Sequence, residues 1–439
     1  MRDVPLTLFL FGSLVPAMRW PWIGTVVFAW VSMMNLHRLT WGFAYDMPFA
    51  AMVAGATLLG WVASRESKSA PKALSVKLFI AFGVWISITT VFAKAPDSAF
   101  AVWTQVLKIF LLVFVTMTTM TEKRRIIILT AVGAVSIGFY GIKGGVHTIM
   151  TGVASRLWGP GGFIGDNNAL ALALVVTLPL FRYLHAIVHK PWLRWILVAC
   201  MGLTLASVIG TQSRGAFLVV SAMLMFMLIK SRQKVVAGLV GLFFVGLVVG
   251  FAPDSWTERM ETIKEYEEDG SSMSRLESWG FNLDIALVSP LVGGGFDVYK
   301  NEALYKSLVP GATINRSPHS IYFEVLGYHG FVGLALFLAL FFATFRMAGS
   351  LIKLARGKAE LFWAAELGAM LQVSLVGYAV GGAFLNLAFF DLPYYLMAIT
   401  VCATAVVQRT LADRQQAQTA VPAAGPPFLP TLGPAMGPR

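Results

Sequence analysis

Long apolar stretches, separated by short polar or basic segments, run along almost the whole chain. Stretches of membrane-spanning length lie at 47–63, 73–93, 99–120, 126–149, 167–188, 192–211, 215–230, 235–252, 320–346, 360–388 and 392–409. They are too long for barrel strands, and lipid offers an exposed backbone no hydrogen-bond partner, so each is expected to form a helix. The pattern predicts an all-α, polytopic integral membrane protein.

The first 34 residues are less regular. Pro16 and Pro21 flank the basic break "MRW", so residues 4–34 form either two short crossings or one broken crossing. The stretch has an apolar centre without a small-residue cleavage site, which favours a retained span over a signal peptide. With both chain ends on one side, the total is even, at about 12 membrane helices.

Basic segments between the apolar stretches give the orientation. They all fall on one side when the spans alternate, and that side is expected to be the cytoplasm. They lie at 65–72, 122–125, 189–194, 230–234 and 353–358. The chain then divides into N-terminal membrane helices (1–252), a periplasmic helical loop (253–318), C-terminal membrane helices (319–410) and a disordered cytoplasmic tail rich in Pro, Gly and Ala (411–439).

The long periplasmic loop carries its own helix signals. "SWTE" (255–258) and "SRLE" (274–277) both fit the capping box, in which an N-cap Ser precedes a Glu by three residues. The first predicts a charged helix that ends near Gly270, and the second an amphipathic helix that ends near Pro290. The "GGG" of 293–295 predicts a flexible turn after it.

Composition agrees with a membrane protein and argues against a nucleic-acid partner. Of the 439 residues 57% are hydrophobic and 13% charged, whereas soluble domains carry about 25% charged residues. The net charge of +12 comes from Lys and Arg gathered between spans, as expected for cytoplasmic loops, and not from one basic face. Cys200 and Cys402 lie inside apolar stretches and are expected to be inert.

His319 is the first candidate for chemistry. Ser317 and Pro318 are predicted to be the N-cap and first residue of a membrane helix, which puts His319 in its first turn on the outer side. The face below it carries Gly330 and Gly333, which predicts close packing of another helix. The positive end of the helix dipole disfavours imidazolium, so a neutral general base is plausible. The alternative is an interfacial histidine that only supports the helix start.

Four arginines on the predicted outer side are the second candidate. Basic residues are disfavoured there, so each needs a reason. The four are Arg156, Arg214, Arg275 and Arg316. A guanidinium group binds phosphate oxygens in a planar fork, so a pyrophosphate on the outer leaflet would explain them. The alternative is that each one reaches lipid head groups or pairs with an acid of the loop.

Other polar residues give weaker signals. Lys108 lies near the middle of its span, where a charge is a functional hypothesis, although it could pair with a backbone carbonyl. His37, Arg38 and Asp46 of an outer loop could join the site. The chain has no D-x-D pair on the outer side, no P-loop and no G-x-S-x-G, so neither a metal site, a cofactor nor a serine nucleophile is expected.

The stretch "HSIYFEVLGYHGFVG" (319–333) resembles the signature of bacterial O-antigen ligases (WaaL). That signature is His, then Asn, Ser or Gln, nine residues, Gly, two residues, then Gly, Thr or Tyr, and the chain fits it at every position. The similarity covers about 156 to 390 and includes "RLWGPGGFIGDNNALAL" (156–172), "SRGAF" (213–217), "SRLESW" (274–279) and "SPLVGGGF" (289–296). The superfamily also holds O-antigen polymerases and protein O-oligosaccharyltransferases, and "NLHRLTWGFAYDMPFA" (35–50) resembles a subgroup of O-glycosylation ligases.

The resemblance implies a metal-independent, inverting glycosyltransferase of the GT-C type in the bacterial inner membrane, with its active site facing the periplasm. The donor would be a glycan on undecaprenyl pyrophosphate and the acceptor a sugar hydroxyl of lipid A–core, both in contact with membrane lipid. His319 would activate that hydroxyl, while Arg214 and Arg275, with Arg156 and Arg316, would hold the pyrophosphate. A polymerase or protein oligosaccharyltransferase remains an alternative, as does a transporter or lipid flippase.

Overall fold

The computed structural model describes residues 2–152, 155–230, 246 and 270–420, and these form helices and connections, without a β-strand among them. The helices are α1 (Asp3–Arg19), α2 (Pro21–Met34), η1 (Leu36–Leu39), η2 (Phe43–Asp46), α3 (Phe49–Ala63), α4 (Leu74–Val91), α5 (Pro96–Thr119), α6 (Lys123–Thr151), α7 (Asn167–Ile187), α8 (Pro191–Gly210), α9 (Arg214–Lys230), α12 (Gly270–Val288), η4 (Val298–Lys300), α13 (Glu302–Leu308), α14 (Ile321–Ala355), η5 (Ala359–Leu361), α15 (Phe362–Gly382) and α16 (Asp391–Ala420).

The all-α, multi-pass architecture is confirmed. Among the described residues 8 helices are long and apolar enough to cross a membrane, and α2 and α3 are shorter apolar helices. The total of about 12 crossings stays a prediction. The predicted span 235–252 lies, apart from residue 246, outside the described residues, as do the tail after Ala420 and the capping box at 255–258.

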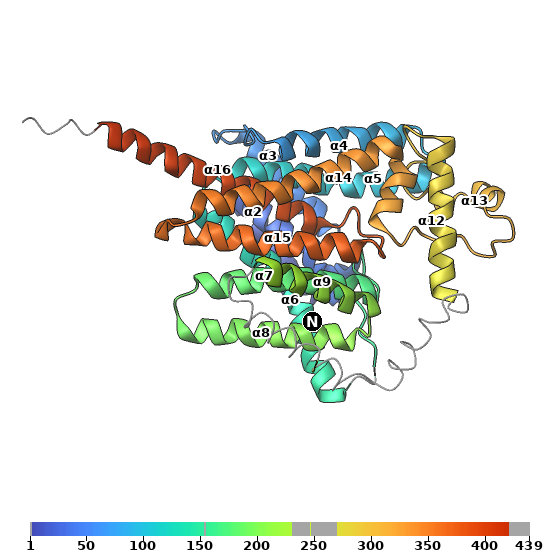
Figure 1. The fold of residues 1–439 in the computed structure, drawn as a ribbon, viewed down its shortest axis with the longest axis horizontal. Helices are drawn as coiled ribbons and strands as arrows, with labels where there is room; N and C mark the ends of the chain where they lie inside the picture. Colours follow the sequence, from blue (N-terminus) through green and yellow to red (C-terminus); the bar gives the residue numbers. More distant parts are fainter. Residues whose placement is uncertain (1, 153–154, 231–245, 247–269, 421–439) are drawn as a thin grey trace, which may run out of the picture.

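The long helices run side by side, and α12 lies across their ends, with α13 beyond it (Figure 1). The helix α16 projects from the opposite end of the bundle. It continues to Ala420, past the end predicted at residue 410. The helix α12 of the long connection therefore covers one end of the bundle.

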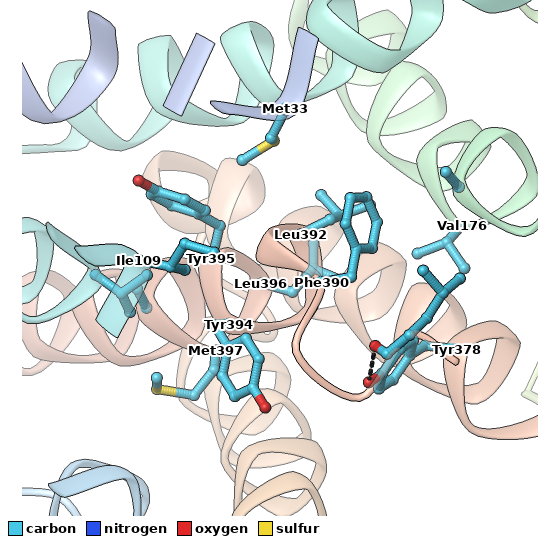
Figure 2. Close-up of a cluster of buried hydrophobic side chains, with 14 of the residues drawn as sticks. Met33, Ile109, Val176, Tyr378, Phe390, Leu392, Tyr394, Tyr395, Leu396 and Met397 are labelled. Carbon is cyan, nitrogen blue, oxygen red and sulfur yellow. Dashed lines mark hydrogen bonds between the residues drawn. The ribbon is translucent and has the colours of Figure 1, made fainter. Parts of the chain in front are cut away.

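The start of α16 forms the centre of the bundle. Tyr394, Tyr395 and Met397 are fully buried, and Figure 2 shows them with Met33 of α2 and Ile109 of α5 around them. Two tyrosine hydroxyls hold the connection in front of α16. Tyr378 Oη donates to the Leu387 carbonyl at 2.9 Å, and Tyr394 Oη donates to the Ala388 carbonyl at 2.6 Å. The connection 383–390 is thus fixed to the core at two consecutive residues.

The predicted start of the helix after Pro318 is wrong. The helix α14 begins at Ile321, and Ser320 occupies the N-cap position. His319 has a φ of 46°, in the left-handed region, so it lies in the connection and outside the helix. The Ser317 hydroxyl does not cap the helix, because it contacts His319 and Asn386. The predicted span 360–388 is also too long, since α15 ends at Gly382.

Gly330 breaks α14 and admits a loop at that position, while α4 packs on the same stretch of α14, where Trp85 Nε1 donates to the His329 carbonyl at 3.0 Å. The Gly330 φ of 68° is non-helical, and the break lets the Phe331 N–H donate to the Pro290 carbonyl at 2.8 Å. A Cβ on Gly330 would lie 2.2 Å from the Leu291 carbonyl oxygen. A Cβ on Gly333 would lie 2.4 Å from the Cβ of His329. Gly330 is therefore required by the kink and by the backbone that fills it, whereas Gly333 is required by its contact with the His329 side chain.

The glycine triplet 293–295 is a buried docking segment and not a flexible turn. The N–H of Gly294 donates to the Gly327 carbonyl at 2.9 Å, and that of Gly295 donates to the Tyr328 carbonyl at 2.8 Å. These bonds fix the end of the long connection to α14. The helix α12 itself ends close to the predicted Pro290, but it begins at Gly270, so the capping box predicted at 274–277 is wrong and lies in the helix interior.

Candidate active site

The His319 side chain is half-buried, and Ser317, two residues before it, is bonded to Ser278 of α12. The backbone N–H of His319 donates to Asn386 Oδ1, which holds the residue in its left-handed conformation. Its Nε2 lies 3.3 Å from Ser317 Oγ. Among the described residues Nδ1 has no hydrogen-bond partner. The imidazole is thus oriented through one nitrogen while the other is unengaged.

A small polar network fixes the segment around His319. Asn386 Nδ2 donates to Ser317 Oγ at 2.7 Å, and Ser278 Oγ of α12 donates to the Ser317 carbonyl at 2.7 Å. The side chain of Asn386 therefore binds both the backbone of His319 and the hydroxyl beside its ring. Three segments that are distant in sequence meet at this point.

The elements that carry this network are packed firmly. Trp279 of α12 stacks on Phe323 of α14, with ring centroids 5.1 Å apart and an angle of 9° between the planes. Glu324 of α14 is buried and accepts from the Ala388 N–H at 3.1 Å. Asn386 is thereby positioned from both sides, since the connection that bears it is held by α14 as well as by the core.

Three charged groups act on the His319 imidazole. The pKa of His319 lies below its ordinary value of 6.5, because burial disfavours the charged ring and Arg275 repels it. Asp166 opposes this by raising the pKa, and Arg316 lowers it further. Arg316 Nε lies 4.0 Å from Glu277 Oε1. The imidazole is therefore neutral at pH 7 and has two guanidinium groups in its electrostatic surroundings.

Arg156 lies on the connection before α7 and Arg214 follows the connection before α9, and these two connections are bonded to each other. Arg214 is the first residue of α9. The Leu157 N–H donates to the Gly210 carbonyl at 3.0 Å, and Asn167 Nδ2 donates to the Thr211 carbonyl at 2.9 Å. Neither arginine is among the groups that shift the pKa of His319. The structure thus brings Arg275 and Arg316 to the histidine and leaves Arg156 and Arg214 at the adjoining connections.

Sequence reasoning missed two residues of this site. Asp166 caps α7, accepting from the N–H groups of Asn168 and Ala169 at 2.8 and 2.9 Å, and its charge reaches His319. The sequence pattern places Asn386 near the end of the predicted span 360–388, whereas α15 ends at Gly382. The isolated amide in "AFLNLAFFD" was the available signal that the helix ends there.

The site as a whole has a defined chemical capacity. A neutral, oriented imidazole beside cations can accept a proton close to an anionic group.

Two protein families match parts of the chain. Residues 197–338 match a family described as O-antigen ligase, and this range includes His319, Arg214, Arg275 and Arg316. Residues 1–187 match a family of unknown function, and this range includes Arg156 and Asp166. The search of curated proteins found no match to the chain. Asn386 lies beyond both matched ranges.

Proposed function

Since the chain belongs to the O-antigen ligase/polymerase superfamily through residues 197–338, we propose that it transfers a glycan from undecaprenyl pyrophosphate to a sugar hydroxyl of lipid A–core on the periplasmic face of the inner membrane. The observation that carries the proposal is the His319 imidazole. It lies outside its helix, is held by Asn386 and Ser317, and has a pKa below the ordinary 6.5.

In the proposed reaction the acceptor hydroxyl gives its proton to His319, and its oxygen attacks the anomeric carbon of the donor sugar. The new C–O bond forms as the bond from that carbon to the pyrophosphate oxygen breaks, which inverts the anomeric configuration. With Nε2 directed at Ser317 Oγ, Nδ1 is the nitrogen that accepts the proton. A neutral imidazole meets this requirement, whereas imidazolium has no lone pair to offer.

In this proposal the arginines stabilise the leaving group, whereas His319 activates the acceptor. Charge develops on the pyrophosphate as it leaves, and guanidinium groups stabilise such charge through paired hydrogen bonds. Arg275 and Arg316 act on the surroundings of His319, which supports a leaving group at that place. Arg214 and Arg156 would hold more distant parts of the pyrophosphate from the adjoining connections.

A polymerase or protein oligosaccharyltransferase would use the same histidine with another acceptor. The experiment that tests the proposal is glycan transfer by the purified full-length chain in the presence of EDTA. Lipid A–core, the lipid-linked glycan itself and an acceptor protein are offered separately. Transfer to lipid A–core that His319→Ala abolishes would support the ligase.

Each other result has a defined meaning. Growth of the lipid-linked glycan without transfer to lipid A–core would favour the polymerase, and glycosylated protein would favour the oligosaccharyltransferase. Full transfer by His319→Ala would refute the catalytic role of His319. In a deletion strain, we expect lipid A–core to lose all O-antigen while long lipid-linked chains remain.

A further inference from the structure

A polar cavity with a volume of about 280 Å³ is lined by residues other than those of the His319 site. Its walls come from the end of α2, from η1, from α5, from residues 162–164 and from the start of α16. Most of these residues fall in the part of the chain that matches a family of unknown function. The proposed chemistry at His319 uses none of the residues that line this cavity.

Lys108 is the feature of the cavity that most requires a ligand. It is the middle residue of α5 in sequence, its side chain is exposed, and it lines the cavity. Among the described residues its ammonium group has no hydrogen bond or ion pair. A cation at this depth in a membrane helix is costly unless an anion or water accompanies it. An anionic group in the cavity would supply the missing partner.

The rest of the wall suits an anion that carries hydroxyl groups. Arg38 lies over the Tyr45 ring at 4.5 Å and adds a second cation. The Nδ1 atom of His37 is buried and has no hydrogen-bond partner among the described residues. The pKa of His37 is lowered, first by burial and then by the charge of Arg38, and the opposing effect of Asp46 is smaller. Asp391 accepts a hydrogen bond from Ser32. Two cations against one carboxylate leave the wall cationic, and the neutral imidazole can bond a hydroxyl.

Aromatic side chains complete the cavity. Phe163 and Phe390 lie at its edge with ring centroids 6.5 Å apart, and Phe28 adds a third ring. Figure 2 shows Phe390 in the core near Met33, which also lines the cavity. Apolar ring faces with a few convergent polar groups are typical of small-ligand sites. The volume admits a sugar-sized group, not a whole lipid-linked glycan.

The cavity and the His319 site have two connections in common. Residues 162–164 of the cavity are followed by Asp166, whose charge reaches His319. Phe390 and Asp391 follow Asn386, which binds His319. A ligand in the cavity would therefore contact the same two connections that carry Asp166 and Asn386.

We propose that this cavity binds an anionic sugar of the acceptor, with Lys108 and Arg38 on its phosphate or carboxylate and with Asp391 and His37 on its hydroxyls. The inference rests on the proposed function, because it takes lipid A–core as the acceptor. It assigns to the N-terminal part of the chain the selection of the acceptor, while the histidine and the arginines of the O-antigen ligase region act on the bond that is exchanged.

The test is the binding of lipid A–core to the purified full-length chain in detergent without anionic lipid. The variants are Lys108→Gln and, as a matched control, Lys143→Gln. Lys143 is an exposed lysine of the membrane helix α6 that does not line the cavity. We expect Lys108→Gln to weaken binding about tenfold, the effect of losing one charge-assisted hydrogen bond, and Lys143→Gln to leave it unchanged.

Phosphatase-treated lipid A–core distinguishes the two anions. If the unsubstituted chain binds the treated lipid as weakly as Lys108→Gln binds the untreated lipid, the anion is a phosphate. If Lys108→Gln still weakens binding of the treated lipid, the anion is a carboxylate. Equal competition by phosphatidylglycerol would overturn the saccharide assignment in favour of any anionic head group. Unchanged binding by both Lys108→Gln and Arg38→Gln, with normal thermal unfolding midpoints, would overturn the inference and leave the proposed function intact.

The transfer assay gives an independent readout. We expect Lys108→Gln to raise the KM for lipid A–core about tenfold while kcat and the KM for the donor stay within about twofold. A lower kcat at saturating acceptor would contradict a role limited to acceptor binding. If the unsubstituted chain transferred glycan yet bound no lipid A–core, both the acceptor and this inference would be wrong, whereas the role of His319 would stand.

Discussion

His319 and His329 belong to one short stretch of chain but lie in opposite surroundings. His319 is half-buried in a connection, where Asn386 and Ser317 contact it and Arg275 and Asp166 act on its charge. His329 is 0% exposed inside α14. Its Nδ1 lies 2.6 Å from Thr89 Oγ1, and its Nε2 has no partner among the described residues.

The difference shows that residue type alone does not make a proton acceptor. Around His329 the neighbours are ring faces and edges. Its ring centroid lies 4.6 Å from Phe296, 5.5 Å from Phe389 and 6.4 Å from Phe82. Neither water nor an acceptor hydroxyl reaches a side chain so enclosed, whereas His319 is reachable and has an unengaged nitrogen. The comparison predicts that chemistry depends on His319 and packing on His329.

The largest effect is expected from His319→Ala. Loss of a general base lowers rates by about 10²–10⁴-fold, so kcat for glycan transfer should fall by that factor while the thermal unfolding midpoint stays close to that of the unsubstituted chain. The measurement is the transfer rate at saturating donor and acceptor. A loss of rate caused by unfolding would be visible in the midpoint and would not support the proposal.

Arg275→Gln should come next. Removing one group that stabilises developing negative charge costs about 10²–10³-fold in kcat. The control is Arg414→Gln at the far end of the chain, where Arg414 pairs with Glu360. That variant should keep its rate. Equal rates for Arg275→Gln and the control would show that Arg275 is an interfacial residue and no part of a pyrophosphate site.

Asn386→Ala tests how strongly the orientation of His319 matters. The substitution removes the acceptor for the His319 N–H and the donor to Ser317 Oγ. We expect kcat to fall about tenfold, because misplacement of a reacting group by a small distance is costly, with the KM values little changed. Partial recovery in Asn386→Asp, which keeps the acceptor oxygen, would separate positioning from packing. A change confined to KM would contradict the role of Asn386 in positioning His319.

The smallest effect is expected from His329→Leu. The Thr89 hydroxyl keeps its bond to the Ile86 carbonyl at 3.0 Å, and a buried nitrogen without a partner is removed. Replacing a buried polar group by an apolar one of similar size is then nearly neutral. The transfer rate should stay within about threefold. A rate loss as large as that of His319→Ala would remove the distinction between the two histidines.

Periodic features of the fold were predictable from the sequence. Apolar stretches gave the positions and order of most of the described membrane helices, because the length of a span follows from the thickness of the bilayer. The end of the helix before Pro290 was predicted correctly, although the capping box used to place its start lies inside α12. These predictions depend on composition along one element and need no knowledge of distant contacts.

The local geometry of the site was not predictable in the same way. Ser317 and Pro318 are typical of a helix start, yet α14 begins only at Ile321. The N–H of His319 instead donates to Asn386, a residue far along the chain. Gly330 and Gly333 have the spacing of a packing face, yet the backbone of Pro290 and Leu291 fills the kink at Gly330. In each case a contact between distant segments decides the local conformation, and the spacing of residue types does not reveal it.

The pH dependence of kcat/KM for glycan transfer tests the central claim most directly. Protonation removes the base, so the rate should fall on the acid side. Because burial and Arg275 lower the pKa of His319, that fall should have an apparent pKa below 6.5, and it should move upward in Arg275→Gln. The residual activity of His319→Ala should lack this acid limb. The same limb in His319→Ala, or a limb above 6.5 in the unsubstituted chain, would contradict the assignment of His319 as the base.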